Sequence, residues 1–268
     1  MKDILKELSG VQKNVSLAPY TTFKIGGKAK YFYEAKSKED LVKAIKAAKE
    51  AGLPFFILGG GSNVLVSDKG FDGLVIKIQN TKYEIQDTRV VADAGVLLSK
   101  LVDESARAGL IGLEWAVGIP GTVGGAVRGN AGAFGVSMSD VVKNIRNYED
   151  VILSVELELK KGDREKSKKM IKEYLEYRDK RHPLEHPSAG CIFKNPEGDF
   201  AGRLIEQCGL KGKKEDGAMI SKKHGNFIVN LGNAKAKDVI KLINLCKKKV
   251  REKFRIELKE EIEYLGEF

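Results

Sequence analysis

Cysteine and histidine are scarce in this sequence, and their scarcity excludes two classes of site. The chain has three cysteines in 268 residues. Cys191, Cys208 and Cys246 share no close spacing and are odd in number, which argues against a zinc motif and against a disulfide framework. The three histidines include His182 and His186, but a proline lies between them, so a helical pair of metal ligands is not expected. We therefore expect no metal.

Long apolar runs and stacking aromatic residues are also missing. No run approaches the roughly 20 apolar residues that a membrane helix needs, and the N-terminal segment MKDILKELSG lacks the apolar core of a signal peptide. We therefore expect no membrane partner and a cytoplasmic location. The net charge is +10 and only 7% of residues are aromatic. The lysine-rich runs at 160–172, 211–215 and 246–253 contain no interleaved stacking residues, so they predict solvated helix faces rather than a nucleic-acid site.

Hydrophobic patterns predict alternating helices and strands in the first part of the chain. Ser37 and Asp40 form a capping-box-like start for a helix over 41–52. Strands are predicted at 55–58, 73–78 and 89–95, with a helix over 97–109, and residues 151–159 alternate as in a half-buried strand. A helical stripe follows at 170–178. The last third predicts strands at 191–195, 227–231 and 256–266, and helices at 201–209 and 239–250.

Two glycine-rich segments could bind phosphate groups. Gly59-Gly60-Gly61-Ser62-Asn63 follows a predicted strand, where backbone N–H groups can bind a pyrophosphate. It is neither a Rossmann nor a Walker motif, because residues 64–66 are again strand-like. The second segment, 118–135, contains seven glycines, which is more than tight packing of a loop requires. Two such segments in one chain indicate an extended dinucleotide ligand, which a basic surface would also suit.

The sequence resembles the UDP-N-acetylenolpyruvoylglucosamine reductases, flavoenzymes of peptidoglycan precursor synthesis. The resemblance covers nearly the whole chain. It rests on seven ordered blocks: YTTFKIGGKAKYF, LGGGSNVLVSDKGFDGLVI, GIPGTVGGAVRGNAGAFG, PSAGCIFKNP, AGRLIEQCGLKG, ISKKHGNFIVN and IELKEEIEYLGE. The chain looks like the short type of the family, which lacks an extra substrate-clamping insertion.

The resemblance implies an α+β fold with a vanillyl-alcohol-oxidase-type FAD-binding region and a C-terminal α+β substrate-binding domain. It places two FAD-binding subdomains at 1–78 and 79–185 and the substrate domain at 186–268, with the last strand returning toward the active site. It implies a monomer that uses FAD as cofactor, NADPH as co-substrate and a UDP-sugar as substrate. The residues implied for FAD are Thr22, Ile25, Gly26, Gly59, Gly60, Gly61, Ser62, Asn63, Ile119, Gly121, Gly124, Gly125 and Ala131.

The same resemblance assigns a role to Cys191. In the family, NADPH reduces the flavin, and a hydride then reaches C3 of the enolpyruvyl group of the substrate. The charge that develops on C2 and the carboxylate needs stabilisation and a proton donor. The donor is normally a serine at the position that Cys191 occupies here. A thiol with an ordinary pKa of about 8.5 is mostly protonated at neutral pH and can donate a proton. A buried structural thiol describes Cys208 and Cys246 better.

The assisting carboxylate has two candidates. The family motif points to Glu261, whereas strict alternation from Ile256 and Leu258 places Glu260 on the apolar face. We favour Glu261 and expect a bulge or bend nearby. Lys194 and Asn195 match the substrate-binding pair of the family, and Arg178 matches an arginine element that precedes PLEHP.

One family element is missing between Asp140 and Asp150, where some two dozen residues normally carry a Tyr-Arg-x-Ser element whose arginine binds the substrate carboxylate. Arg146 is the nearby candidate for that catalytic role. Otherwise the chain is a shortened variant with weakened catalysis, or a mobile loop is missing from the sequence. We favour a missing loop, which predicts a break in the chain within 144–148.

Two other functions compete with the reductase. One is a flavoprotein of the same superfamily with a different substrate, although the PSAGCIFKNP and IELKEEIEYLGE blocks belong to the substrate side and argue against it. The other is a protein that binds a nucleotide sugar and has lost turnover, for which the missing arginine element is the best support.

Overall fold

The computed structural model describes residues 4–268, which divide into two compact units. The first unit comprises residues up to Gln12, 32–60 and 73–178, and the second comprises 13–31, 61–72 and 179–268. Strands β2 (Lys28–Ala35) and β5 (Phe71–Ile78) each have residues in both units. The chain therefore leaves and re-enters each unit, and the division expected at residues 78 and 185 stays a prediction.

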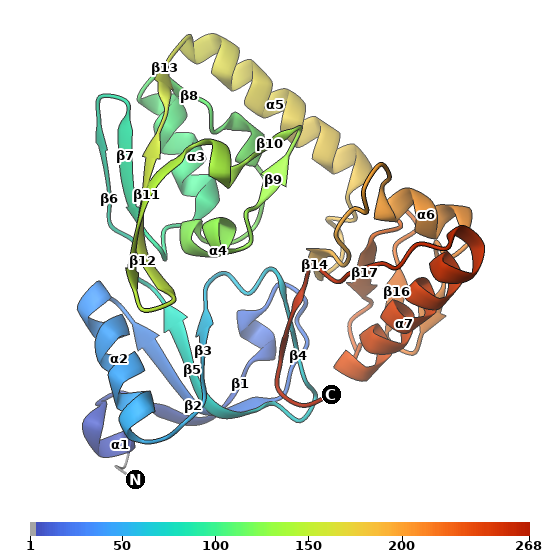
Figure 1. Ribbon diagram of the computed structural model, residues 1–268, viewed down its shortest axis with the longest axis horizontal. Coiled ribbons are helices and arrows are strands. Elements are labelled where there is room, and N and C mark those ends of the chain that lie inside the picture. Colours follow the sequence, from blue (N-terminus) through green and yellow to red (C-terminus); the bar gives the residue numbers. More distant parts are fainter. Residues whose placement is uncertain (1–3) are drawn as a thin grey trace. The chain divides into compact units, whose positions relative to one another are not determined.

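A four-stranded antiparallel sheet forms the centre of the first unit (Figure 1). Its order is β11–β12–β7–β6, and its strands are β6 (Tyr83–Gln86), β7 (Arg89–Asp93), β11 (Val142–Tyr148) and β12 (Val151–Glu158). One face of this sheet packs in a single core with α3 (Leu98–Arg107) and α4 (Val123–Arg128). The alternating residues of β12 and its continuation are buried as expected, at Val151, Leu153, Val155, Leu157 and Leu159.

Local sequence signals explain the parallel pair in this unit. Helix α2 (Lys38–Glu50) begins after Ser37, whose hydroxyl accepts a hydrogen bond from the Asp40 N–H at 3.0 Å. This cap satisfies one of the donors that a helix start leaves open. Strand β3 (Phe55–Leu58) then pairs in parallel with β5, in a sheet of order β1–β2–β5–β3. The predicted helix start and strand are confirmed.

The other elements of the first unit are short, except for one long helix. They are α1 (Ile4–Glu7), β8 (Leu110–Ile111), the 3₁₀ turns Glu114–Ala116 and Met138–Asp140, β9 (Gly132–Ala133), β10 (Val136–Ser137), β13 (Lys160–Lys161) and α5 (Arg164–Arg181, which belongs to this unit up to Arg178).

Strand β11 is continuous, so the expected break at 144–148 is wrong. Asn144, Ile145, Arg146, Asn147 and Tyr148 all pair with residues of β12. A two-residue turn then joins the two strands. The chain therefore closes this hairpin without the additional family element.

A second antiparallel sheet, of order β14–β17–β16–β15, forms the centre of the second unit. Its strands are β14 (Ser188–Cys191), β15 (Lys214–Glu215), β16 (Ala218–Ile220) and β17 (Phe227–Asn230). Helices α6 (Ala201–Gln207) and α7 (Ala236–Phe254) pack with this sheet in one core. The unit also holds β1 (Gln12–Ser16, from Lys13 onward), the 3₁₀ turn Ala18–Tyr20 and β4 (Val64–Val66).

The C-terminal segment is less regular than the sequence predicts. A continuous strand is expected over 256–266, but only β18 (Glu263–Leu265) forms a ladder, parallel to β4. Before it, Glu260 makes an isolated antiparallel bridge with Phe193. The segment bends at Ile262 between these two pairings.

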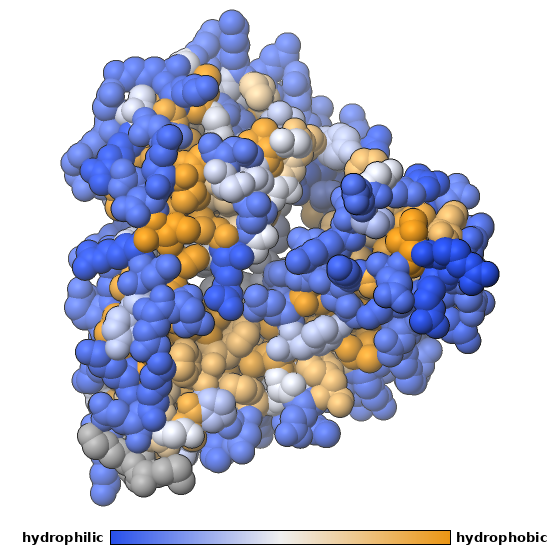
Figure 2. Space-filling view, in the orientation of Figure 1, coloured by the Kyte–Doolittle hydropathy of each residue, from blue (hydrophilic) through white to orange (hydrophobic). Residues whose placement is uncertain are grey.

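The lysine-rich surface of α7 is a solvated face. Lys247 pairs with Glu260 at 2.9 Å and Lys249 with Glu252 at 3.0 Å. Figure 2 shows mostly hydrophilic residues over the outer sides of α2 and α7. Within residues 4–268, no helix is long and apolar enough to cross a membrane, and no group of three or more potential metal ligands is present.

Candidate active site

In the first unit the two glycine-rich segments touch. A Cβ added at Gly60 would lie 2.5 Å from the Cα of Gly121, and one added at Gly59 would lie 2.6 Å from the Thr122 hydroxyl oxygen. Any larger residue in this part of the turn would force the segments apart. Lys77 donates a hydrogen bond to the Gly59 carbonyl, and burial lowers the pKa of the Lys77 amine. The structure thus brings Gly59 and Gly60 together with Gly121.

The segment 118–135 is partly helical, which the sequence analysis did not predict. Helix α4 begins after Thr122, whose hydroxyl accepts a hydrogen bond from the Gly125 N–H at 3.3 Å. A Cβ at Gly124 would lie 2.6 Å from that of Ala94. Gly124 is therefore required for packing, whereas Ile119 and Ala131 are half-buried at the edge of the core.

In the second unit, Thr22 is tied to Gly61. Its N–H and its hydroxyl both donate to the Gly61 carbonyl, at 2.9 and 3.3 Å. A Cβ at Gly61 would overlap the Tyr20 carbonyl oxygen, and Gly26 packs in the same way on Val66. Ile25 is 2% exposed and belongs to the core, so only its backbone is available to a ligand.

The residues that are present fit a flavin dinucleotide. Among residues 4–268, no hydrogen bond uses the backbone N–H of Gly60 or Gly61, so both donors are available to phosphate oxygens. The absence of side chains at these positions also leaves room for a flat group near the backbone. In the first unit, Gly59, Gly60 and Gly121–Gly125 are the residues that would hold FAD.

The segment of Cys191 pairs with the segment of Glu261. Cys191 is half-buried at the end of β14. Next to it, Ile192 accepts a hydrogen bond from the Glu261 N–H at 2.8 Å. On the other side, the Asn63 amide donates to the Glu261 carbonyl at 3.0 Å, and the Glu263 N–H donates to the Asn63 carbonyl at 2.9 Å. The backbone of Glu261 is therefore fixed between the Cys191 strand and the end of the glycine turn.

The two glutamates have different environments. Glu260 shares the side of Leu258 and Ile262, both buried, and its carboxylate forms an ion pair with Lys247 of α7. Water reaches part of Glu261, but desolvation by the surrounding protein raises the pKa of its carboxyl, an effect that the positive charge of Lys194 opposes. Glu260 thus ties the segment to α7, which leaves Glu261 as the predicted assisting carboxyl group. The expected bend is present, one residue beyond Glu261.

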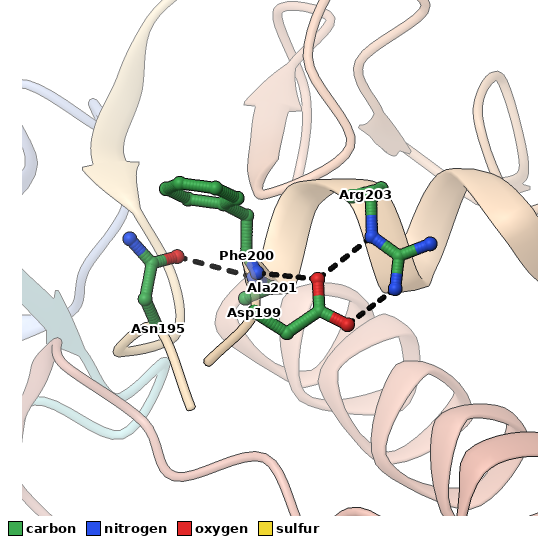
Figure 3. Close-up of polar contacts among 5 residues, drawn as sticks. All are labelled: Asn195, Asp199, Phe200, Ala201 and Arg203. Carbon is green, nitrogen blue, oxygen red and sulfur yellow. Dashed lines mark hydrogen bonds and ion pairs between the residues drawn. The ribbon is translucent and has the colours of Figure 1, made fainter. Parts of the chain in front are cut away.

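The predicted substrate pair lies on the surface at the start of α6. Lys194 and Asn195 are both exposed. The Asn195 side-chain oxygen accepts a hydrogen bond from the Ala201 N–H at 3.1 Å, which fixes the turn before the helix (Figure 3). In the same turn, Arg203 holds the Asp199 carboxylate with two hydrogen bonds and lowers its pKa to about 2. This ion pair keeps the Asn195 turn in place, and the Asn195 amide nitrogen can still donate to a ligand.

Two predicted arginines of the first unit lie in different places. Arg178, on α5, is only 9% exposed and packs against Gly118 at the start of the glycine-rich segment. Arg146 is exposed on β11 and lines a recess of about 530 Å³ with residues of α2 and Leu153. None of the other predicted site residues lines that recess. The geometry therefore favours Arg178 over Arg146 as a ligand for the substrate, and the catalytic role of Arg146 gains no support.

Family models match most of the chain. Residues 29–165 match a model of the FAD-binding domain, and residues 182–265 match the C-terminal domain of UDP-N-acetylenolpyruvoylglucosamine reductase. The crystal structure of the reductase from Thermus caldophilus superposes with a TM-score of 0.82 at 36% sequence identity, covering 96% of this chain and 99% of that chain. The expected fold class is confirmed.

Curated relatives show the same similarity, and one of them has aligned positions that this chain lacks. The reductase from Alkaliphilus oremlandii is 43% identical over 276 residues, covering 92% of this chain and 91% of the relative. The reductase from Caldanaerobacter subterraneus is 38% identical over 294 residues and covers all of this chain, so about 26 aligned positions have no counterpart among its 268 residues. The high coverage of the Thermus caldophilus enzyme shows that a chain of similar length has this fold. The chain belongs to the UDP-N-acetylenolpyruvoylglucosamine reductase family.

Proposed function

We propose that this chain reduces the enolpyruvyl ether of UDP-N-acetylglucosamine to UDP-N-acetylmuramate, with FAD as cofactor and NADPH as reductant. The observation that carries this proposal is the pairing of 192–194 with 259–261, which fixes Cys191, Lys194 and Glu261 in one part of the second unit. These residues supply a proton donor, a cation and a carboxyl group, which are the groups that the reaction needs.

The chemistry adds one hydride and one proton across a carbon–carbon double bond. Bound FAD supplies hydride transfer from NADPH to C3 of the enolpyruvyl group. The negative charge that this leaves on C2 and the carboxylate calls for nearby cations, of which Lys194 supplies one. The Cys191 thiol donates the proton to C2 and recovers it from water. Because its pKa is raised, Glu261 keeps its proton to a higher pH than an ordinary glutamate and can assist that donation.

The relatives are UDP-N-acetylenolpyruvoylglucosamine reductases, which supports the substrate, and the matching fold supports the flavin. The missing element keeps one alternative open, a nucleotide-sugar-binding protein without turnover. The similar length of the Thermus caldophilus reductase argues against this alternative, because that enzyme carries the reductase name with nearly complete mutual coverage.

The test is an anaerobic visible spectrum of the purified flavoprotein. NADPH should bleach the flavin band. Addition of one equivalent of the enolpyruvyl UDP-sugar should then restore it. Reduction by NADPH without reoxidation by this substrate would contradict the reductase and support the binding protein. A protein that neither contains nor takes up FAD would contradict both the reductase and a flavin-containing binding protein.

A further inference from the structure

The glycine-rich segment 118–135 ends in a strained turn. Strands β9 and β10 pair Ala133 with Val136, which leaves Phe134 and Gly135 as a two-residue turn. Both have positive φ, 54° and 80°, as in a type I′ turn, where asparagine, aspartate and glycine are preferred at the first position. Phenylalanine is a bulky residue that rarely adopts this conformation. Such strain persists where surrounding contacts hold the residue in place, and it is common at functional sites.

Two tyrosines of α5 hold the Phe134 ring. Tyr174 stacks on it with ring centroids 4.0 Å apart and planes inclined by 20°, and Tyr177 meets it edge-on at 5.3 Å and 72°. The helix itself is anchored about two turns before Tyr174, where the Ser167 hydroxyl donates to the buried Glu114 carboxylate at 2.7 Å. The aromatic contacts therefore join a fixed helix to the turn.

The same contacts enclose Arg178. Its guanidinium carbon lies 5.8 Å from the centre of the Phe134 ring, within the range of a cation–π contact. Its aliphatic stem packs on Gly118, where an added Cβ would lie 2.9 Å from the Arg178 Cδ. Gly118 also has a φ of 72°, so a side chain there would be strained as well as blocked. The stem and the head of Arg178 are thus both positioned by the ends of segment 118–135.

We propose that Tyr174 and Phe134 are positioning residues, which orient the Arg178 guanidinium to bind the enolpyruvyl carboxylate of the substrate. This inference rests on the proposed function. A guanidinium fork matches a carboxylate in two-point geometry when its orientation is restricted, and the cation–π contact with the held Phe134 ring restricts it. The carboxylate is favoured over the diphosphate because Gly118 begins the segment expected to bind FAD, and the reacting end of the substrate must meet the flavin.

The first variant is Tyr174→Leu, which removes the stacked ring and keeps an apolar side chain. We expect kcat/KM for the enolpyruvyl UDP-sugar to fall about tenfold, mainly through KM, because a guanidinium that is free to turn loses two-point binding. Flavin content and the rate of flavin reduction by NADPH should stay at the wild-type level. Tyr174→Phe keeps the stack and should restore KM. The affinity for UDP-N-acetylglucosamine, which lacks the carboxylate, should not change.

Met170→Ala is the matched control. Met170 lies on the same helix as Tyr174, and its exposed fraction of 40% equals that of Phe134. Within the described residues it makes no contact with an aromatic ring. A double-mutant cycle between Tyr174→Leu and Arg178→Lys should be clearly non-additive. An unchanged KM in flavin-loaded Tyr174→Leu, an additive cycle, or an equal loss of UDP-N-acetylglucosamine affinity would each overturn the inference. Absence of turnover in the wild type would instead contradict the proposed function.

Discussion

The three thiols of this chain differ in what their surroundings allow. Cys246 is 1% exposed in the core of the second unit, where burial raises its pKa to about 12. Burial also raises the pKa of Cys208, which caps α6. Both are structural residues. Of the three, Cys191 alone lies at a strand end beside the backbone that pairs with the Glu261 segment, and it is the thiol that we propose as the proton donor.

The first residue-scale prediction concerns this thiol. Cys191→Ala should lower the rate of substrate-dependent flavin reoxidation by about 10²–10⁴-fold, the usual contribution of a general acid. Cys191→Ser restores an O–H donor and should retain most of the rate. Flavin reduction by NADPH should be unchanged in both variants, and stopped-flow absorbance measures the two half-reactions separately. Cys208→Ala is the control. A Cys191→Ala variant with normal reoxidation would rule out the thiol as donor.

A second prediction follows from the pKa of Glu261. Desolvation raises this pKa above its ordinary value of 4.5, so the folded state binds the proton more tightly than the unfolded state. The stability from this group is complete below pH 4.5 and is lost as the pH rises through the raised value. Glu261→Gln should therefore raise Tm at pH 8 and change it little at pH 4. Calorimetry at both pH values measures this, with Glu257→Gln, a change at an exposed carboxylate of the same segment, as the control.

The positions that a motif indicates are consistent with the structure, while the roles of these residues stay predictions. The glycines at 59–61 lie where no side chain fits, and Glu261 is favoured by its motif. The surroundings of Arg146 were not predictable, because they depend on which face of β11 meets α2. The Phe134 cluster was missed as well, although Tyr174, Tyr177 and Arg178 have the spacing of one helix face. The contact partner of that helix face is Phe134, in the turn between β9 and β10, and helix spacing alone does not indicate it.

At the element scale, local signals predicted most of the helices and strands, but the strand expected over 191–195 is wrong, because β14 already ends at Cys191. Helix α2 follows from its cap and apolar spacing, and β12 from strict alternation over 151–159. The last strand was predicted poorly for a physical reason. Residues 256–262 pair only at Glu260, and then the chain bends to reach β4, so one alternating pattern spans two different partners. Periodicity cannot reveal such a change of partner.

Asp68 provides an element-scale prediction. Its two carboxylate oxygens accept hydrogen bonds from the Ala236 and Lys237 N–H groups, at 2.8 and 3.1 Å, so a residue far away in sequence caps α7. Asp68→Ala should lower the free energy of unfolding by about 1 kcal/mol, the typical cost of a lost cap. Urea denaturation at pH 7 measures this. Asp68→Asn keeps one acceptor and should lose less; an equal loss in both variants would attribute the effect to charge rather than to capping.

At the scale of the whole molecule, the sequence predicted family and fold but not the short hairpin. The expected break within 144–148 is replaced by paired strands, because Tyr148 and Val151 can close a two-residue turn at Glu149 and Asp150. Glu149 takes a positive φ of 53° there, and its carboxylate pairs with Lys49 of α2. These contacts stabilise the short turn between β11 and β12. They are specific to this connection, so a comparison with longer relatives could not predict them.

The last prediction uses FAD itself as the probe of the whole fold. A ligand that binds only the folded state stabilises it by RT ln(1 + [L]/Kd), about 2.7 kcal/mol at a free concentration of 100 Kd. For a chain of this size that corresponds to a rise in Tm of about 5–10 °C. Removal of FAD should therefore lower Tm by this amount, and its return should reverse the change.

FMN is the informative control, because it has the same ring system without the pyrophosphate and adenosine. If the N–H groups of Gly60 and Gly61 bind the pyrophosphate, FMN should raise Tm much less than FAD at equal concentration. Equal shifts from the two flavins would show that the glycine turn contributes nothing to binding. The absence of any shift with excess FAD would show that the folded chain does not bind this cofactor. A ligand that binds only the folded state must raise Tm when it is present in excess over its Kd.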